Sequence, residues 1–181
     1  MKIYLFIRLA VFTILAVLIG VFSHHLLEHF LQYLVGSVML LYGLEGIFLP
    51  FVLHKKRVIR EYQFYLGHVD LLLGLVVILA IQQFDQICII WATWTIVRES
   101  FELYETGHKA MHGFPAVLSF ALSIIEIVFS ILLLLFATEH HALTHVYLLI
   151  PELIINGLSP LLFLFYKEYR EKKRNKEKEA Q

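Results

Sequence analysis

The sequence predicts an all-α, polytopic membrane protein with six transmembrane helices arranged as three hairpin repeats. Of its 181 residues, 59% are hydrophobic and 17% are charged, and the mean hydropathy is +0.74. Soluble domains are usually about 45–50% apolar. Six apolar runs approach the roughly 20 residues that cross a bilayer. They lie at 3–22, 31–53, 62–81, 86–105, 115–137 and 146–166. We therefore expect one transmembrane domain over residues 1–166 and a charged tail at 167–181.

The overall charge argues against a nucleic-acid partner. Fifteen Lys and Arg residues balance fifteen Asp and Glu residues, so no basic excess is present to bind phosphates. The single cysteine, Cys88, cannot form an internal disulfide. The sequence has no nucleotide-binding loop, no nucleophile with a base at helical spacing and no dinucleotide fingerprint. We therefore expect that the protein is not an enzyme and has no cofactor, apart from the metal alternative considered below.

The cations lie at one set of helix ends. The connections 24–30, 82–86 and 138–144 contain no Lys or Arg, whereas the termini and the other two connections do. The positive-inside rule then predicts that both termini are cytoplasmic, and we expect the bacterial inner membrane as the location. The first run resembles a signal peptide, but Arg8 interrupts it and no small-residue cleavage site follows, so we expect a retained span. The tail should anchor at the lipid interface, with contact to anionic lipid as a further expectation.

A repeat of about 57 residues aligns three hairpins, at about 1–57, 58–112 and 113–166. In the odd-numbered spans, Thr13, Asp70 and Glu126 correspond. In the even-numbered spans the corresponding sets are Glu45, Glu102 and Ser159; Tyr42, Glu99 and Asn156; and Val38, Thr95 and Glu152. Because each hairpin would bury the same small and polar face, we expect a pseudo-threefold arrangement about an axis normal to the membrane.

These patterns resemble the HdeD acid-resistance membrane protein family, whose members are six-span proteins built from a short hairpin repeat. The resemblance is carried by Gly67, Asp70 and Gly74 in a G-x-x-D-x-x-x-G pattern, by YLVGSVMLLYGLEGIF at 33–48, and by the hairpin spacing. It implies a role in surviving acid at the inner membrane and supplies no catalytic residues. The chain departs from the pattern in its third repeat, which has Ser123 and Ser130 in place of glycine and is interrupted by prolines.

Ionisable side chains inside the predicted spans are the first candidate site. An ionised carboxylate in the bilayer costs several kcal/mol, so such a group pairs, faces water or stays protonated. The proton- or ion-linked candidates are Asp70, Glu126, Glu45, Arg98, Glu99, Glu102, Glu152 and Asn156. Asp70 and Glu126 have no basic partner on their own helices, so we expect neutral carboxyls that either bind protons or only pack.

Two polar stripes extend this site. Arg98 and Glu102 are four residues apart on one helical face, which predicts a cytoplasmic-end ion pair or, together with Glu45, a vestibule for a cation. Glu152 and Asn156 continue to Ser159 in the last span, between Pro151 and Pro160. Those prolines free backbone carbonyls that either coordinate a cation or only accompany a kink.

Histidines in the outer connections are the second candidate site. H-H-L-L-E-H at 24–29 and H-H-A-L-T-H at 140–145 occupy equivalent places in repeats one and three. The candidates are His24, His25, His29, His140, His141 and His145. Spacing of four residues puts two imidazoles on one helical face, as a zinc clamp requires. A pH sensor is the alternative, because imidazole titrates near pH 6.5, and simple interfacial histidines are the third possibility.

Three functions remain open from the sequence. The leading hypothesis is a non-enzymatic membrane protein of acid or envelope stress that responds to protonation of the outer histidines and buried carboxyls. The second is a small transporter or channel for protons or divalent cations. The third is a structural or scaffolding membrane subunit. The bilayer is the expected partner in each case, with homo-oligomerisation left open.

Overall fold

Six α-helices form the chain in a computed structural model, which describes residues 2–52, 57–107 and 114–179. The helices are α1 (Lys2–His29), α2 (Leu31–Val52), α3 (Arg57–Ala80), α4 (Phe84–Gly107), α5 (Phe114–Leu135) and α6 (Glu139–Glu179). No strand occurs among the described residues. The predicted all-α class is confirmed.

Two segments expected as outer connections are helical instead. Residues 24–29 form the end of α1, and residues 139–145 form the start of α6. Neither segment contains Gly or Pro, so nothing local stops the helix. At the start of α6, the Thr138 hydroxyl accepts a hydrogen bond from the backbone N–H of His141 at 3.4 Å, as an N-cap does.

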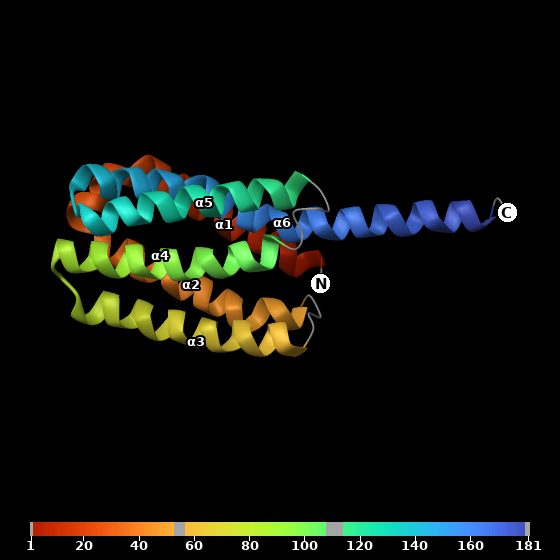
Figure 1. Cartoon of the computed structure of the whole chain (residues 1–181), viewed down its shortest axis with the longest axis horizontal. Coiled ribbons are helices and arrows are strands. Elements are labelled where there is room, and N and C mark those ends of the chain that lie inside the picture. Colours follow the sequence, from red (N-terminus) through yellow and green to blue (C-terminus); the bar gives the residue numbers. More distant parts are fainter. Residues whose placement is uncertain (1, 53–56, 108–113, 180–181) are drawn as a thin grey trace.

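The helix ends are sorted along the long axis of the bundle (Figure 1). The short connections at Phe30, Ile81–Gln83 and Phe136–Thr138 lie at one end. The start of α1 lies at the other end, where α6 continues beyond the bundle. The cation-free connections are therefore together, away from both termini.

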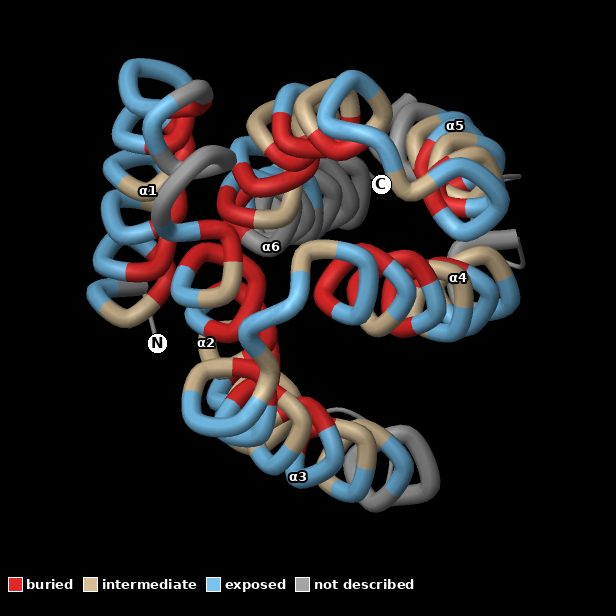
Figure 2. The backbone as a smooth tube through the Cα atoms, turned by 90° about the vertical axis from the view of Figure 1, so that its left-hand side faces the viewer, coloured by how far each residue is buried: buried red, intermediate tan, exposed pale blue. Residues whose placement is uncertain are grey.

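The closest helix pairs join neighbouring hairpins. The most extensive packing is between α2 and α3, between α1 and α6, and between α4 and α5. Within the described residues, the two helices of each predicted hairpin share less contact than these pairs. Viewed along the bundle, α2, α4 and α6 lie nearer the centre than α1, α3 and α5, and the buried residues of the helices face inward (Figure 2). The largest fully buried side chains include Trp91, Tyr42 and Phe12.

Glycines set the distance between α2 and α3. A Cβ on Gly43 would lie 2.8 Å from the Gly67 carbonyl oxygen, and one on Gly36 would lie 2.8 Å from the Gly74 carbonyl oxygen. Real Cβ atoms do not approach so closely. The two backbones can meet only because these positions have no side chain.

The three residues aligned in the odd-numbered spans differ in burial. Asp70 on α3 and Glu126 on α5 are buried. Thr13 on α1 is exposed, and its neighbour Phe12 is buried, at 1% exposure. Thr13 therefore does not belong to the buried face of its helix, unlike the two carboxyls.

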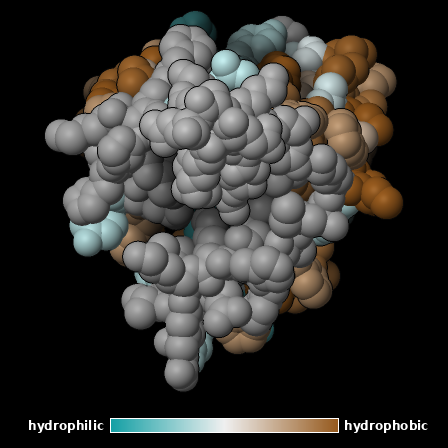
Figure 3. Space-filling model, turned by 90° about the vertical axis from the view of Figure 1, so that its right-hand side faces the viewer, coloured by the Kyte–Doolittle hydropathy of each residue, from teal (hydrophilic) through white to brown (hydrophobic). Residues whose placement is uncertain are grey.

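Apolar side chains cover much of the outer flank of the bundle. Among the described residues, three helical segments are long and apolar enough to cross a membrane, at Ile3–Ser23, Leu31–Leu49 and Tyr62–Ala80, and a shorter apolar segment covers Phe120–Leu135. Exposed large hydrophobic side chains include Ile3 and Leu79, each 77% exposed. Figure 3 shows hydrophobic surface around the side of the molecule, beyond the end from which it is viewed.

Candidate functional site

A buried ion pair joins α1 to α2. Arg8 donates through Nε and Nη2 to the two carboxylate oxygens of Glu45, the Nη2 distance being 2.9 Å. Arg8 Nη1 also donates to the carbonyl oxygens of Asn156 and Gly157 on α6. Glu45 is therefore paired with Arg8. The sequence had grouped Glu45 with Arg98 and Glu102, but Arg98 pairs with Asp70 instead.

The contact between Arg8 and the Asn156 carbonyl depends on Pro160, one of the two prolines of α6. A helical carbonyl normally accepts from the N–H four residues later, which for Asn156 is residue 160. Residue 160 is proline and has no N–H. The freed carbonyl is bound by the guanidinium of Arg8. The carbonyl freed by Pro160 is therefore satisfied by a side chain of the protein.

A second ion pair joins α3 to α4. Arg98 Nη1 donates to Asp70 Oδ2 at 2.8 Å, and the Trp94 indole donates to Asp70 Oδ1 at 2.8 Å. The sequence did not predict this pair, because the cation comes from another helix. The guanidinium also lies 3.8 Å from the centre of the Tyr42 ring, a cation–π contact.

Tyr42 connects this pair to α6. Its hydroxyl donates to Glu152 Oε1 and accepts from Asn156 Nδ2 at 3.0 Å. Asn156 Nδ2 also lies 3.4 Å from Glu152 Oε1 on the next turn of the same helix. The predicted Glu152–Asn156 stripe is thus part of a network, while the Ser159 side chain lies outside the described residues.

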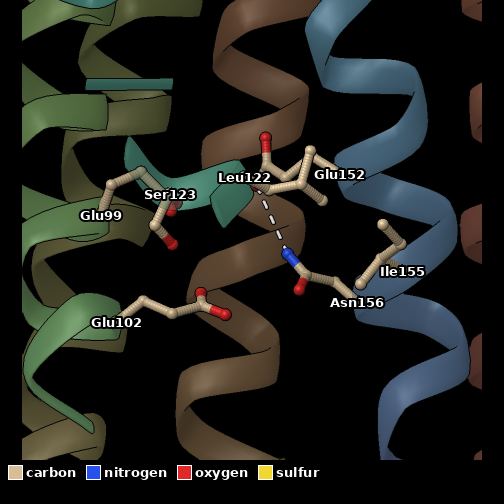
Figure 4. A pocket seen from close by; sticks show the side chains of 7 residues that line it. All are labelled: Glu99, Glu102, Leu122, Ser123, Glu152, Ile155 and Asn156. Atoms are coloured by element: carbon tan, nitrogen blue, oxygen red, sulfur yellow. Dashed lines mark hydrogen bonds between the residues drawn. The ribbon is translucent and has the colours of Figure 1, made fainter. Parts of the chain in front are cut away.

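A small pocket lies where α4, α5 and α6 meet (Figure 4). It is lined by Glu99, Glu102, Leu122, Ser123, Glu152, Ile155 and Asn156. Glu99 and Ser123 share a side-chain hydrogen bond, and Figure 4 shows the Glu102 carboxylate reaching toward the space between α4 and α6. The structure therefore brings together four predicted residues, namely Glu99, Glu102, Glu152 and Asn156.

Glu126 lies beside His145, on the same α4–α5–α6 interface. Glu126 is 1% exposed and His145 is 2% exposed, and their Oε2 and Nε2 atoms are 3.9 Å apart. His145 Nε2 is also 3.4 Å from the Thr95 hydroxyl. The Trp91 ring meets the imidazole edge to face, with centres 4.6 Å apart. His145 is therefore a core residue and not a member of an outer rim.

The buried charges do not balance locally. Arg8 and Arg98 pair with Glu45 and Asp70. Within the described part of the chain, no Arg or Lys lies within ion-pair distance of Glu99, Glu126 or Glu152. A carboxyl in an apolar interior without a cation is most stable as the neutral acid. This set, hereafter the carboxyl cluster, is Glu99, Glu126 and Glu152.

The remaining histidines do not assemble into a metal site among the described residues. His25 packs its ring 5.4 Å from Phe30, and His141 Nδ1 lies 2.7 Å from the Thr138 hydroxyl. His140 is exposed. The side chains of His24 and His29 lie outside the description. In the part that is described, no group of three His, Cys, Asp or Glu side chains could hold a metal ion.

Several network residues are not among the predicted site residues. Arg8, Trp91 and Trp94 are such residues, and all three are buried. Tyr42 aligns with Glu99 and Asn156 in the repeat, and this position was the available signal for its role. Comparisons of the chain with protein-family models, characterised proteins and solved structures found no match.

Proposed function

We propose that the chain is a multi-pass, non-enzymatic membrane protein of acid or envelope stress whose carboxyl cluster takes up protons. One observation carries this proposal. Among the described residues, no Arg or Lys is paired with Glu99, Glu126 or Glu152. Each carboxyl can hold a proton, and each would lose it at a cost set by the apolar surroundings and by repulsion from the other two.

The membrane part of the proposal is supported by the outer surface. Large apolar side chains face outward along α1 and α3, and three helical segments are long enough to cross a bilayer. Six spans in three repeats, with both termini cytoplasmic, agree with the grouping of the cation-free connections at one end. The bacterial inner membrane is the proposed location, and the resemblance to the HdeD family adds the setting of acid stress.

Infrared difference spectroscopy on the purified protein tests proton uptake. Acidification from an alkaline starting pH, at which the cluster is ionised, should increase the C=O stretch of protonated carboxylic acids, and Glu99→Gln, Glu126→Gln and Glu152→Gln should each remove part of that band. Glu139→Gln, at an exposed position, is the matched control. An acid-induced band equal in the parent and all three variants would exclude the cluster as the proton store.

Growth of a deletion strain tests the physiological role. The parent gene should restore survival in acid, while genes carrying Glu99→Gln or Glu152→Gln should restore less, at equal protein level in the membrane. Equal survival with every variant would contradict a role of the carboxyl cluster in acid survival.

A cation transporter is the second candidate, favoured by the oxygen-rich lining of the pocket. Glu99, Glu102 and Glu152 present carboxylates there, beside the Asn156 amide and the Ser123 hydroxyl. Oxygen ligands of this kind suit hard cations. Proteoliposomes loaded with a divalent-ion dye distinguish the two: metal-dependent flux lost in Glu102→Gln supports transport, and no flux above empty liposomes excludes it.

A further inference from the structure

We infer that His145 and Glu126 form a proton relay that connects the α5–α6 end of the bundle to Glu99 and Glu152. This inference rests on the proposed proton uptake and specifies its route. Its geometric basis is the 3.9 Å separation of His145 Nε2 and Glu126 Oε2, with both side chains buried in the same interface. One water molecule or a small side-chain rotation spans such a distance.

Unpartnered atoms concentrate at this pair. Among the described residues, four buried side-chain nitrogen or oxygen atoms have no hydrogen-bond partner. Three of them are Glu126 Oε1, Ser130 Oγ and His145 Nδ1. Polar groups that only hold a core together normally have their hydrogen bonds satisfied, because each open one costs about 1–3 kcal/mol. The unsatisfied groups here retain the capacity to accept and pass a proton.

The pair also lies in the right order along the helices. On α6, His141 lies one turn from His145 toward the connecting end, and Glu152 lies two turns beyond it, about 10 Å away by helical rise. On α5, Glu126 lies one turn from Ser123, whose hydroxyl shares a hydrogen bond with Glu99. Titratable groups therefore follow one another from the exposed start of α6 to the pocket.

The transfer step conserves charge and atoms. After a jump from alkaline pH, at which Glu126 is ionised, a proton enters at His145 Nδ1 from the connecting end, and the Nε2–H proton passes to the Glu126 carboxylate. The N–H bond breaks as an O–H bond forms, leaving a neutral imidazole and a neutral carboxylic acid. Removing both charges at once is favourable in an apolar interior, where an isolated ion is costly. Glu126 then exchanges its proton with Glu99 or Glu152.

Charged groups from neighbouring helices interact with Glu126 and with the carboxyls beyond it. Glu126 interacts with Glu99 of α4 and Glu152 of α6. Those two carboxyls also interact with Arg98 and Glu102 of α4, and Glu152 accepts a hydrogen bond from Tyr42 of α2. Arg98 is held by Asp70 of α3, and Arg8 of α1 is held by Glu45 of α2. Neither guanidinium lies between His145 and Glu126, so no fixed cation blocks the path.

Stopped-flow acidification of the purified protein tests the relay by separating rate from amplitude. The infrared carboxylic-acid signal, or proton uptake by a pH dye, is followed after the jump. His145→Gln should slow uptake at least about tenfold, within the range that a positioned proton-transfer group contributes, and should keep the final amplitude. His68→Gln is the matched control, since His68 is exposed and bonded to the Phe64 carbonyl on its own helix.

Rescue by added imidazole tests whether the loss of rate comes from the missing proton carrier at position 145. His145→Ala should be slow, and added imidazole should restore its rate; this variant also serves if His145→Gln does not accumulate. Parent rates in both variants, or slow uptake that imidazole does not restore, would overturn the relay while leaving proton uptake intact. No uptake amplitude in the parent would instead overturn the proposed function, and the relay with it.

Discussion

Arg98 donates to Asp70 at 2.8 Å and thereby links α4 to α3, two consecutive helices that share little close backbone contact. Trp94 donates to the other carboxylate oxygen, so both oxygens of Asp70 are bound by α4. The carboxylate is 2% exposed and the guanidinium side chain 19% exposed. Polar contacts of this kind fix one helix against the other where packing contributes little.

Asp70→Asn should destabilise the protein strongly. Removing one partner of a buried ion pair typically costs about 3–5 kcal/mol, because the other charge remains buried. Thermal unfolding in detergent measures the loss. Glu126→Gln is the matched comparison: it should unfold within a few degrees of the parent, since an amide replaces a neutral acid that no Arg or Lys binds. Equal unfolding temperatures for the two variants would contradict the assignment.

Pro160→Ala should weaken the dependence on Arg8. Alanine supplies the N–H that the Asn156 carbonyl lacks, so Arg8→Met should cost about 1 kcal/mol less in that background than in the parent, one hydrogen bond's worth. Unfolding free energies of the two single variants and the double variant give this coupling. Pro151→Ala is the control and should show none, because the carbonyl that Pro151 frees, that of Tyr147, is not among the atoms that Arg8 binds.

Gly43→Ala should disrupt the α2–α3 pair. Its Cβ would lie 2.8 Å from the Gly67 carbonyl oxygen and 2.8 Å from the Leu71 nitrogen, both backbone atoms that cannot yield locally. A loss of about 1–3 kcal/mol is expected from overpacking. Gly20→Ala is the control, since its nearest contact would be ordinary, at 3.5 Å from the end of Ile150. The prediction fails if both variants unfold alike.

Cysteine labelling should place the short connections and the C-terminal tail on opposite sides of the membrane. Single cysteines at Gln82 and Lys178, in a Cys88→Ala background, are treated with a membrane-impermeant reagent on intact cells and on inverted vesicles. Gln82 is exposed, whereas Ala142, near the start of α6, is fully buried and unsuitable. Labelling of both from the same side would reject the proposed orientation.

Hydropathy and charge placement were sufficient to predict the six helices and the end at which each connection lies. Helical periodicity also predicted that Glu152 and Asn156 lie on one face of the last span, where the Asn156 amide lies 3.4 Å from the Glu152 carboxyl. These features depend on local sequence. They do not depend on which helices pack against one another.

Only the tertiary structure decided which groups pair. Glu102 lies one turn from Arg98 on the same helix, yet Arg98 binds Asp70 of α3. His145 was expected in the outer rim but lies in the core beside Trp91. Periodicity identifies a face but not the helix that packs against it, its register or its distance. A long side chain therefore takes its partner from interhelical geometry, which here depends on glycine contacts such as Gly43 with Gly67.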